Sequence, residues 1–314
     1  MKNFRNIVAS LFISVLLTAC ATVSPAKTNI ADLKVLAAES LIADIAQNIA
    51  GDRIVIQTLI PDGYETHSFQ PTPQDVSSIL KSDLFIMNGG GYEGWMSEVT
   101  AANATEMNLV EASHGLEFRH VVDDHSAENE PTATDEHLHE LGDPHFWTDP
   151  NNVIKYAENI RDALIALDPE GKSTYEQNTI AYIKELNDLD IWIKDQVNVI
   201  PAEKRIIITN HDELGYFADH YGFEVVGTLL EGTSSESSAS SQHIVDLINT
   251  IKEHQVNVVF IELVDDPALA AQIQEETGIM IINELNTHSL MVDGKTASYI
   301  EVTKNNVLLL TELK

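Results

Sequence analysis

The first half of the chain alternates between short apolar runs and stretches whose apolar residues recur at helical spacing. The runs predict three buried strands, at residues 33–38, 53–60 and 83–88. Residues 40–50 predict a helix between the first two strands, and a second helix is predicted to start at Thr72-Pro73, where a capping side chain precedes a proline. This alternating order is typical of a parallel sheet with helices on both faces.

A long helix is predicted in the middle of the chain, after a shorter one at residues 151–167. Residues 172–200 contain no proline or glycine, and apolar residues recur there at helical spacing: Ile180, Ile183, Leu186, Leu189, Ile193 and Val197. At 1.5 Å per residue, roughly 28 helical residues would reach about 40 Å, enough to run along two lobes. A long surface helix within a single domain is the alternative interpretation.

The second half of the chain repeats the strand and helix alternation. Strands are predicted at residues 204–209, 223–230, 256–262 and 279–283, with helices at 242–254, 267–276 and 298–313. We therefore predict an α/β fold of two βα lobes, each with a mainly parallel sheet, joined by a single long backbone helix. The predicted division is an N-terminal lobe at 20–168, a connecting helix at 169–200 and a C-terminal lobe at 201–314.

Residues 1–19 are predicted to be a signal peptide that is not part of the fold. Lys2 and Arg5 precede an apolar run, residues 7–17, that is too short to span a bilayer comfortably. Residues 17–20, Leu-Thr-Ala-Cys, resemble the bacterial lipoprotein cleavage box, which implies that Cys20 is lipidated and anchors the chain to the membrane. An ordinary secretory signal is the alternative. Cys20 is the only cysteine, so the composition excludes disulfides and thiolate metal sites.

The chain is strongly acidic, with a formal charge of −31. This charge argues against binding to nucleic acid and against electrostatic docking on anionic lipid, while it attracts cations. The segment at about residues 114–142 is poor in apolar residues and is predicted to be a mobile surface loop. Between Glu117 and Asp143 it contains four histidines that would form a weak metal site, unless it is simply a solvated insertion: His120, His125, His137 and His139.

Four further histidines are each predicted to lie in a loop at or near the carboxyl edge of a sheet: His67, His145, His211 and His288. His145 lies between two Asp-Pro pairs, at residues 143–144 and 149–150, which should hold it stiffly, although a buried turn would look the same. Ligands bind beyond the carboxyl ends of parallel strands. Four imidazoles suit zinc and could close a tetrahedral shell without water, which is the pattern of a carrier or structural site.

The chain resembles the solute-binding lipoproteins of zinc and manganese ABC transporters, known as the cluster A-I binding proteins. The motifs that carry this resemblance are residues 66–75, 88–95, 143–150 and 211–218. It implies two βα lobes joined by one long helix, with the metal in the cleft between the lobes. It also implies that His67, His145 and His211 are ligands. Histidine rather than glutamate at the third of these positions is similar to the zinc-binding branch.

The fourth ligand departs from the family pattern. The family commonly has Glu-Leu-x-x-Asp-Ser-Leu, and residues 284–290 read Glu-Leu-Asn-Thr-His-Ser-Leu, so His288 stands in place of aspartate. Another register would put Asn283 there and leave three histidine ligands. An all-nitrogen shell disfavours manganese, but it leaves the charge of a buried ion unneutralised. Copper, nickel and cobalt are therefore alternative metals for this site.

The resulting functional prediction is a monomeric, extracytoplasmic, lipid-anchored protein that binds Zn²⁺ and delivers it to an ABC-type permease. It is not expected to be an enzyme, because a catalytic zinc keeps an open position for water and no His-Glu-x-x-His helix is present. Binding of manganese or another transition metal, a metallohydrolase and a surface adhesin are the alternatives.

Overall fold

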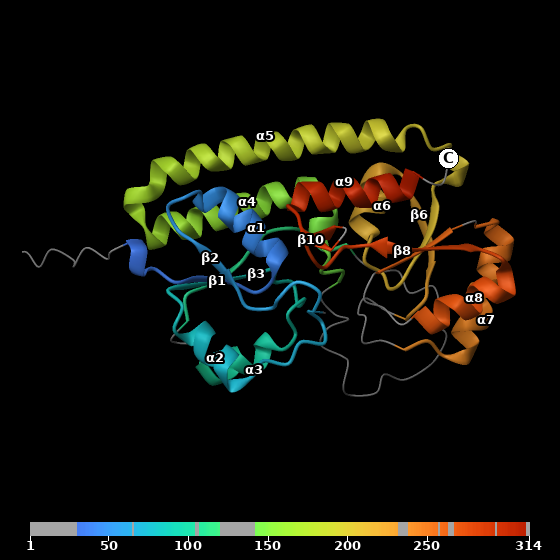
Figure 1. Ribbon diagram of the computed structural model, residues 1–314, viewed down its shortest axis with the longest axis horizontal. Coiled ribbons are helices and arrows are strands. Elements are labelled where there is room, and N and C mark those ends of the chain that lie inside the picture. The colour runs from blue at the N-terminus through green and yellow to red at the C-terminus, as the bar shows by residue number, and fades with distance from the viewer. Residues whose placement is uncertain are drawn as a thin grey trace, which may run out of the picture.

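The computed structural model describes residues 30–64, 66–103, 107–119, 142–231, 238–256, 258–262, 267–292 and 294–311. Two βα lobes lie side by side beneath one long helix, α5 (Lys172–Val197), which runs along the length of the molecule (Figure 1). The mixed α/β fold with parallel strands is therefore confirmed, while the lobe boundaries stay a prediction. The signal peptide, Cys20 and the acidic segment from 120 to 141 lie outside the described residues.

The first lobe is built on a four-stranded parallel sheet in the order β2-β1-β3-β4. Val35 of the central strand β1 lies opposite Ile56 on one side and Leu84 on the other. The strands are β1 (Val35–Ala37), β2 (Ile56–Thr58), β3 (Leu84–Met87) and β4 (Leu109–Glu111), and the helices are α1 (Ser40–Ala50), α2 (Pro73–Leu80) and α3 (Met96–Asn103).

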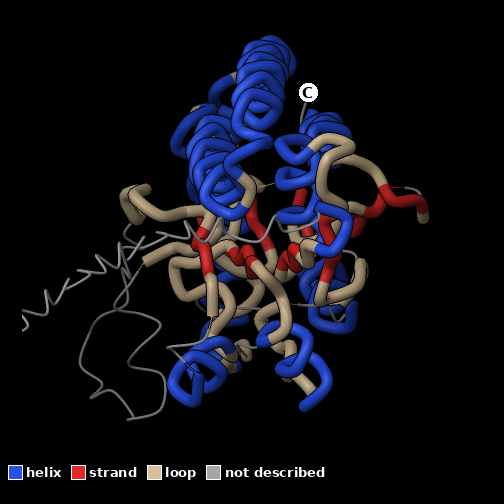
Figure 2. The backbone as a smooth tube through the Cα atoms, turned by 90° about the vertical axis from the view of Figure 1, so that its left-hand side faces the viewer, coloured by secondary structure: helices blue, strands red, loops and turns tan. Residues whose placement is uncertain are grey.

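Both faces of this sheet are buried, because helices cover each of them. Alternate residues of a strand point to opposite faces. Leu84 and Ile86 of β3 accordingly join the core under α1 and α4 (Pro150–Leu167), whereas Phe85 and Met87 pack toward α2 and α3. Figure 2 shows the helices on both sides of the strands. The near-continuous apolar composition of β1 and β3 follows from this double burial.

The long helix has 26 residues, which corresponds to about 39 Å at 1.5 Å per residue. It packs against α1, α4 and α9 (Tyr299–Leu310), so it contacts elements from both halves of the chain. The predicted apolar stripe is partly wrong, because Ile180 is 70% exposed and Tyr182 is buried in its place. The buried face then continues through Leu186, Leu189 and Ile193 as predicted.

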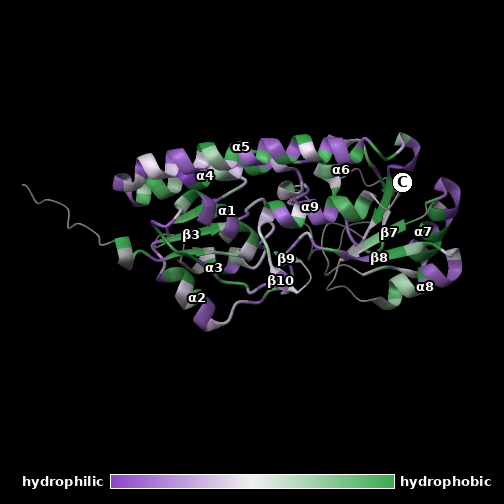
Figure 3. Ribbon diagram, turned by 45° about the horizontal axis from the view of Figure 1, so that its top comes forward, coloured by the Kyte–Doolittle hydropathy of each residue, from purple (hydrophilic) through white to green (hydrophobic). Residues whose placement is uncertain are grey.

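The second lobe contains two parallel strand pairs, β5-β6 and β7-β8, with β5 beside β7. Its sheet strands are β5 (Ile206–Thr209), β6 (Glu224–Thr228), β7 (Val258–Glu262) and β8 (Met280–Leu285). The helices are α6 (Gly215–Tyr221), α7 (Ser241–His254), α8 (Pro267–Thr277) and α9, and a small antiparallel hairpin pairs β9 (Met291–Val292) with β10 (Lys295–Thr296). Figure 3 shows β7 and β8 as largely hydrophobic ribbons.

Sequence patterns did not predict α3, β4, α6 or the hairpin. These elements are two to eight residues long. Equally short elements such as β1 and α2 were predicted because an apolar run or a capping residue before proline marked them. The run of three glycines after β3 does turn sharply, since Gly89, Gly90 and Gly91 all have positive φ. Within the described part of the chain, no helix is long and apolar enough to cross a membrane.

Candidate metal centre

The four candidate histidines come from four separate loops. His67 lies between β2 and α2, and His145 directly precedes a short 3₁₀ turn, Phe146–Thr148, that leads into α4. His211 follows β5 by two residues, and His288 follows β8 by three. Two of these loops belong to each half of the chain, so the histidines can meet only where the two lobes face each other.

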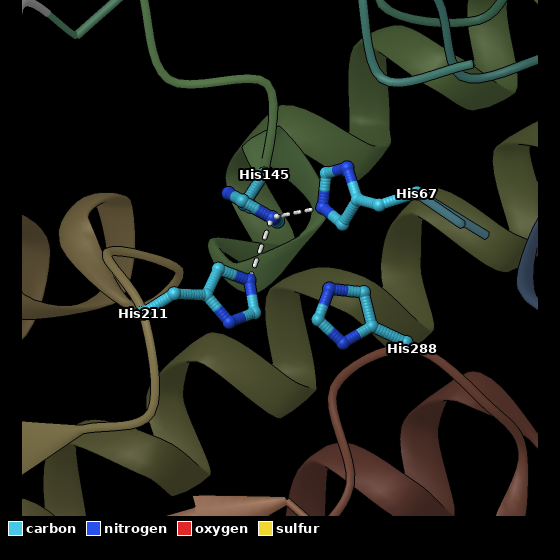
Figure 4. Close-up of side chains that lie close together, drawn as sticks. All are labelled: His67, His145, His211 and His288. Carbon is cyan, nitrogen blue, oxygen red and sulfur yellow. Dashed lines mark hydrogen bonds between the residues drawn. The ribbon is translucent and has the colours of Figure 1, made fainter. Parts of the chain in front are cut away.

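The structure brings all four side chains together (Figure 4). One ring nitrogen from each of the four lies within 4.8 Å of the others. His67 Nε2 is 3.2 Å from His145 Nε2, and His211 Nε2 is 3.4 Å from the same atom. A tetrahedral zinc shell with Zn–N bonds of about 2.0–2.1 Å places its nitrogens about 3.3–3.4 Å apart. The two closest spacings therefore fit a shared metal ion.

Burial favours the neutral, ligating form of these rings. His145 and His211 are fully buried and His288 is 5% exposed, while His67 is partly exposed. Desolvation, followed by the charges of the other three histidines, lowers the pKa of His211 well below its ordinary value. The lone pair that a metal needs on His211 is therefore available at neutral pH.

A buried carboxylate holds His145 in place. Asp143 Oδ1 is 2.8 Å from His145 Nδ1 and also accepts the backbone N–H of His145 at 2.9 Å. Burial raises the pKa of Asp143 to about 7, against the effect of this backbone hydrogen bond and of Arg119, whose Nη1 is 3.8 Å from Asp143 Oδ2. A carboxylate on the outer nitrogen fixes the tautomer of a ligating histidine and raises its basicity.

The second Asp-Pro pair has a different role from the first. Asp149 is the N-cap of α4 and accepts the backbone N–H of Asn151 at 2.8 Å, with Pro150 in the first helical turn. This confirms the predicted helix start. The stiff presentation predicted for His145 thus comes from an anchored helix on one side and a carboxylate contact on the other.

The loop after β8 places His288 in the cluster and Asn283 outside it. Asn283 is an exposed residue of β8, whereas His288 is buried with its Nδ1 3.1 Å from Thr287 Oγ1. Trp147 Nε1 donates to the backbone oxygen of Thr287 at 2.7 Å. The loop is therefore fastened to the segment that carries His145.

Two aromatic rings enclose the cluster. Tyr92 makes an edge contact with His67 at 4.7 Å between ring centroids and stacks on His288 at 6.0 Å. Trp147 lies 5.2 Å from His145. An apolar shell of this kind limits access of water to a metal site.

Sequence reasoning missed two buried carboxylates, Asp143 and Glu213, as functional residues. It expected an all-nitrogen shell to leave the charge of a buried ion unneutralised, and it did not consider Glu213, which is fully buried with Oε2 4.0 Å from His211 Nε2. Asp-Pro before His145 was a usable signal for Asp143. Glu213 gave no comparable signal, because its approach to the cluster depends on the fold.

Other described histidines lie away from the cluster. His114 is exposed, and His220 on α6 lies between Asp149 and Asp190, at 3.2 and 3.1 Å. His243 Nε2 is 2.8 Å from the backbone oxygen of Thr228. Among the residues that the structure describes, the four-histidine group is the one metal-compatible cluster found.

The geometry agrees with the family to which the sequence is matched. The family described as "Zinc-uptake complex component A periplasmic" matches residues 35–313. The chain belongs to this family. The relatives of this chain are solute-binding proteins of ABC transporters and are not enzymes. The chain is therefore an extracytoplasmic metal-binding protein of this type.

Individual relatives carry names that refer to manganese and to adhesion. The manganese-binding lipoprotein MntA of Halalkalibacterium halodurans is 33% identical over 88% of this chain and 86% of its own length. The Mn-bound periplasmic metal-binding protein of candidatus Liberibacter asiaticus is 27% identical, with a TM-score of 0.76 over 90% of this chain and 100% of its own. A mutant of the laminin-binding adhesin Lmb from Streptococcus agalactiae is 25% identical, with a TM-score of 0.76 over 90% and 99%.

Proposed function

We propose that this protein captures Zn²⁺ outside the cytoplasm and delivers it to an ABC permease, with His67, His145, His211 and His288 as the four ligands. The observation that carries the proposal is the convergence of four ring nitrogens within 4.8 Å of one another. In this proposal Cys20 carries the lipid that keeps a monomeric protein at the outer face of the membrane.

The donor set is the reason to prefer zinc over manganese. Imidazole nitrogen suits zinc and other late first-row metals, whereas manganese favours carboxylate, carbonyl and water oxygen. The names of the relatives point to manganese, yet those names describe other chains. Four nitrogens also complete a tetrahedral shell and leave no position for a reactive water, which suits a carrier. Copper, nickel and cobalt accept nitrogen ligands too, so they are the competitors that the test includes.

The proposal is tested by competition titrations of metal-free protein with zinc, manganese, copper, nickel and cobalt. We expect one tight zinc per chain, and we expect simultaneous replacement of His67, His145 and His211 by alanine to abolish it. His254→Ala is the matched control, since this exposed histidine ends α7 away from the cluster. Tight one-to-one zinc binding by the triple variant would contradict the ligand assignment, and preferential manganese binding by the wild type would contradict the choice of metal.

The acidic segment has its own test. Deletion of residues 123–140 should leave the tight site unchanged and remove only weaker additional binding, because the four ligands lie outside this segment. Loss of the tight site in this deletion variant would show that the acidic segment and the four-histidine site are not independent.

An adhesin is the second candidate function, and it is favoured by the similarity to the laminin-binding protein. The two functions are separable, because adhesion would require contact with laminin and zinc delivery would not. Binding of the wild-type protein to immobilised laminin, measured with and without zinc, decides whether adhesion accompanies metal capture.

A further inference from the structure

Glu213 has a buried carboxyl group beside the four-histidine cluster. It lies in the loop between β5 and α6, and its side chain is fully buried. Its Oε2 is 4.0 Å from His211 Nε2 and 3.7 Å from His288 Nδ1. Glu213 is not a member of the group of converging ligand atoms. Its charge is therefore next to the ligands but outside the ligand shell.

Thr287 connects Glu213 to His288. The hydroxyl of Thr287 donates to Glu213 Oε2 at 2.6 Å, and the same oxygen is 3.1 Å from His288 Nδ1. A hydroxyl has a single proton to donate. With Glu213 ionised, Thr287 donates that proton to Glu213 and accepts from His288, an arrangement that favours the tautomer with a hydrogen on Nδ1 of His288. The lone pair of the ring is then on Nε2.

The arrangement reproduces, through a hydroxyl, what Asp143 does directly for His145. In both cases a buried carboxylate orders the outer nitrogen of a histidine and leaves the other nitrogen able to bind a metal. The two carboxylates come from different halves of the chain. Asp143 lies near the Arg119 guanidinium, whereas the ion-pair contacts of Glu213 are made to His211 and His288.

The position of Glu213 has a consequence for the choice of metal. Four neutral imidazoles contribute no charge to a buried divalent ion, and burying an uncompensated charge is costly. A carboxylate that coordinated the ion would supply charge together with an oxygen ligand, which manganese prefers. An ionised Glu213 would supply the charge from beside the histidines without being one of the converging ligand groups, so the first shell would remain nitrogen.

We propose that Glu213, acting through Thr287, is the positioning residue that makes His288 the fourth nitrogen ligand and that favours zinc over manganese at this site. The inference rests on the proposed function and deepens it. Loss of an outer-shell partner typically weakens metal binding by about 10–100-fold. Zinc should lose more than manganese, because the weakened ligand is the nitrogen that zinc prefers.

The test compares zinc and manganese dissociation constants for the full mature chain and four variants. Glu213→Gln keeps the shape of the side chain but removes its charge, and Thr287→Val removes the hydroxyl at nearly constant volume. We expect zinc binding to weaken at least about tenfold in both, with a smaller loss for manganese. Thr287→Ser keeps the hydroxyl and should bind zinc about as tightly as the wild type does. Glu284→Gln removes the same charge from an exposed position on β8 and is the matched control.

A spectroscopic readout separates positioning from a general structural effect. In metal-free protein, long-range ¹H–¹⁵N spectra should show His288 as the Nδ1–H tautomer in the wild type and in Thr287→Ser. Glu213→Gln and Thr287→Val should show a mixture or the other tautomer. The signal is assigned by its disappearance in His288→Ala. The serine and valine variants at position 287 keep the test informative even if Glu213→Gln fails to fold.

The outcomes distinguish this inference from the proposed function. Absence of tight zinc binding by the wild type would reject the proposed function itself. Tight wild-type binding with equal affinities in Glu213→Gln and Glu284→Gln would reject only the role of Glu213. An unchanged tautomer of His288 in Thr287→Val would also overturn it.

Discussion

At the scale of single residues, the candidate centre depends on groups outside the four-histidine cluster. Asp143 contacts both the ring and the backbone of His145 with the same oxygen, Oδ1. Tyr216 Oη donates to the backbone oxygen of Asp143 at 2.8 Å, so this carboxylate is itself fixed by the other half of the chain. The ring of His145 is thus oriented by a chain of contacts.

We expect Asp143→Asn to weaken zinc binding by about 10–100-fold, because the amide keeps the shape but loses the charge that raises the basicity of His145. Isothermal titration or chelator competition measures the change. Asp195→Asn, at an exposed position of α5, is the control and should bind zinc as the wild type does. Equal affinity in the two variants would show that the outer charge has no part in binding.

At the scale of elements, the site is made by loops that follow strands, and the turns of these loops have their own support. The glycine turn after β3 is closed by Glu93, whose carboxyl oxygens accept the backbone N–H groups of Asn88 and Gly89 at 2.7 and 3.0 Å. This turn carries Tyr92 to the histidines. A side chain at Gly89 would come within 2.6 Å of Glu111 Cβ, so the turn has room only for glycine.

Glu93 gives the fold a pH dependence of defined sign. Burial, with the nearby carboxylate of Glu39 second, raises the pKa of Glu93 to about 8. The folded state therefore keeps a proton that the unfolded state loses above its ordinary pKa. Stability from this group is complete below about pH 4.5 and is lost as the pH rises through 8.

We expect the unfolding free energy of the wild type to fall relative to that of Glu93→Gln by about 1.4 kcal/mol per pH unit between about pH 5 and 7. Urea denaturation of metal-free protein over this range measures the difference. Glu98→Gln on α3 is exposed and should leave the wild-type slope unchanged. If the unfolding free energies of the wild type and Glu93→Gln changed in parallel with pH, the raised pKa of Glu93 would be contradicted.

At the scale of the whole molecule, direct contacts between the lobes supplement the long helix. Arg119, which follows β4, pairs with Asp212 at 3.2 Å and with Asp219 on α6 at 3.0 Å. Its backbone N–H donates to Tyr216 Oη at 2.9 Å. Tyr299 Oη on α9 donates to the backbone oxygen of Trp147 at 2.7 Å. The lobes are therefore held together on the side from which the ligands project.

We expect Arg119→Met to lower the unfolding free energy by about 3 kcal/mol, because it leaves the buried carboxyl of Asp143 and the part-buried carboxyl of Asp212 without a cation. Denaturant unfolding at fixed pH measures it. Arg161→Met removes an arginine that pairs with the exposed Asp162 on α4 and should cost less than about 1 kcal/mol. Similar losses in both variants would mean that the Arg119 contacts act as ordinary surface ion pairs.

The sequence by itself determined the order of the elements and the loops that carry the candidate ligands. Helix α1 begins and ends where the apolar spacing predicts, and Asp149-Pro150 marks the start of α4. These features are local, since helix periods, proline and capping residues act within a few positions. The placement of His67, His211 and His288 in loops after predicted strands, and of His145 before a capped helix start, is also a local property, and it was sufficient to predict that each lies at or near the carboxyl edge of its own sheet.

Only the tertiary structure decided which groups surround those histidines. Glu213 and Thr287 are 74 residues apart in the sequence, and Trp147 and Thr287 are 140 apart. Contacts over such separations depend on how loops from two lobes approach each other. The spacing of apolar residues along the chain carries no information about that approach. The same reason explains the exposure of Ile180 and the choice of His288 over Asn283. Local physics arranged the candidate ligands along the chain, and lobe packing brought them together and placed Asp143 and Glu213 beside them.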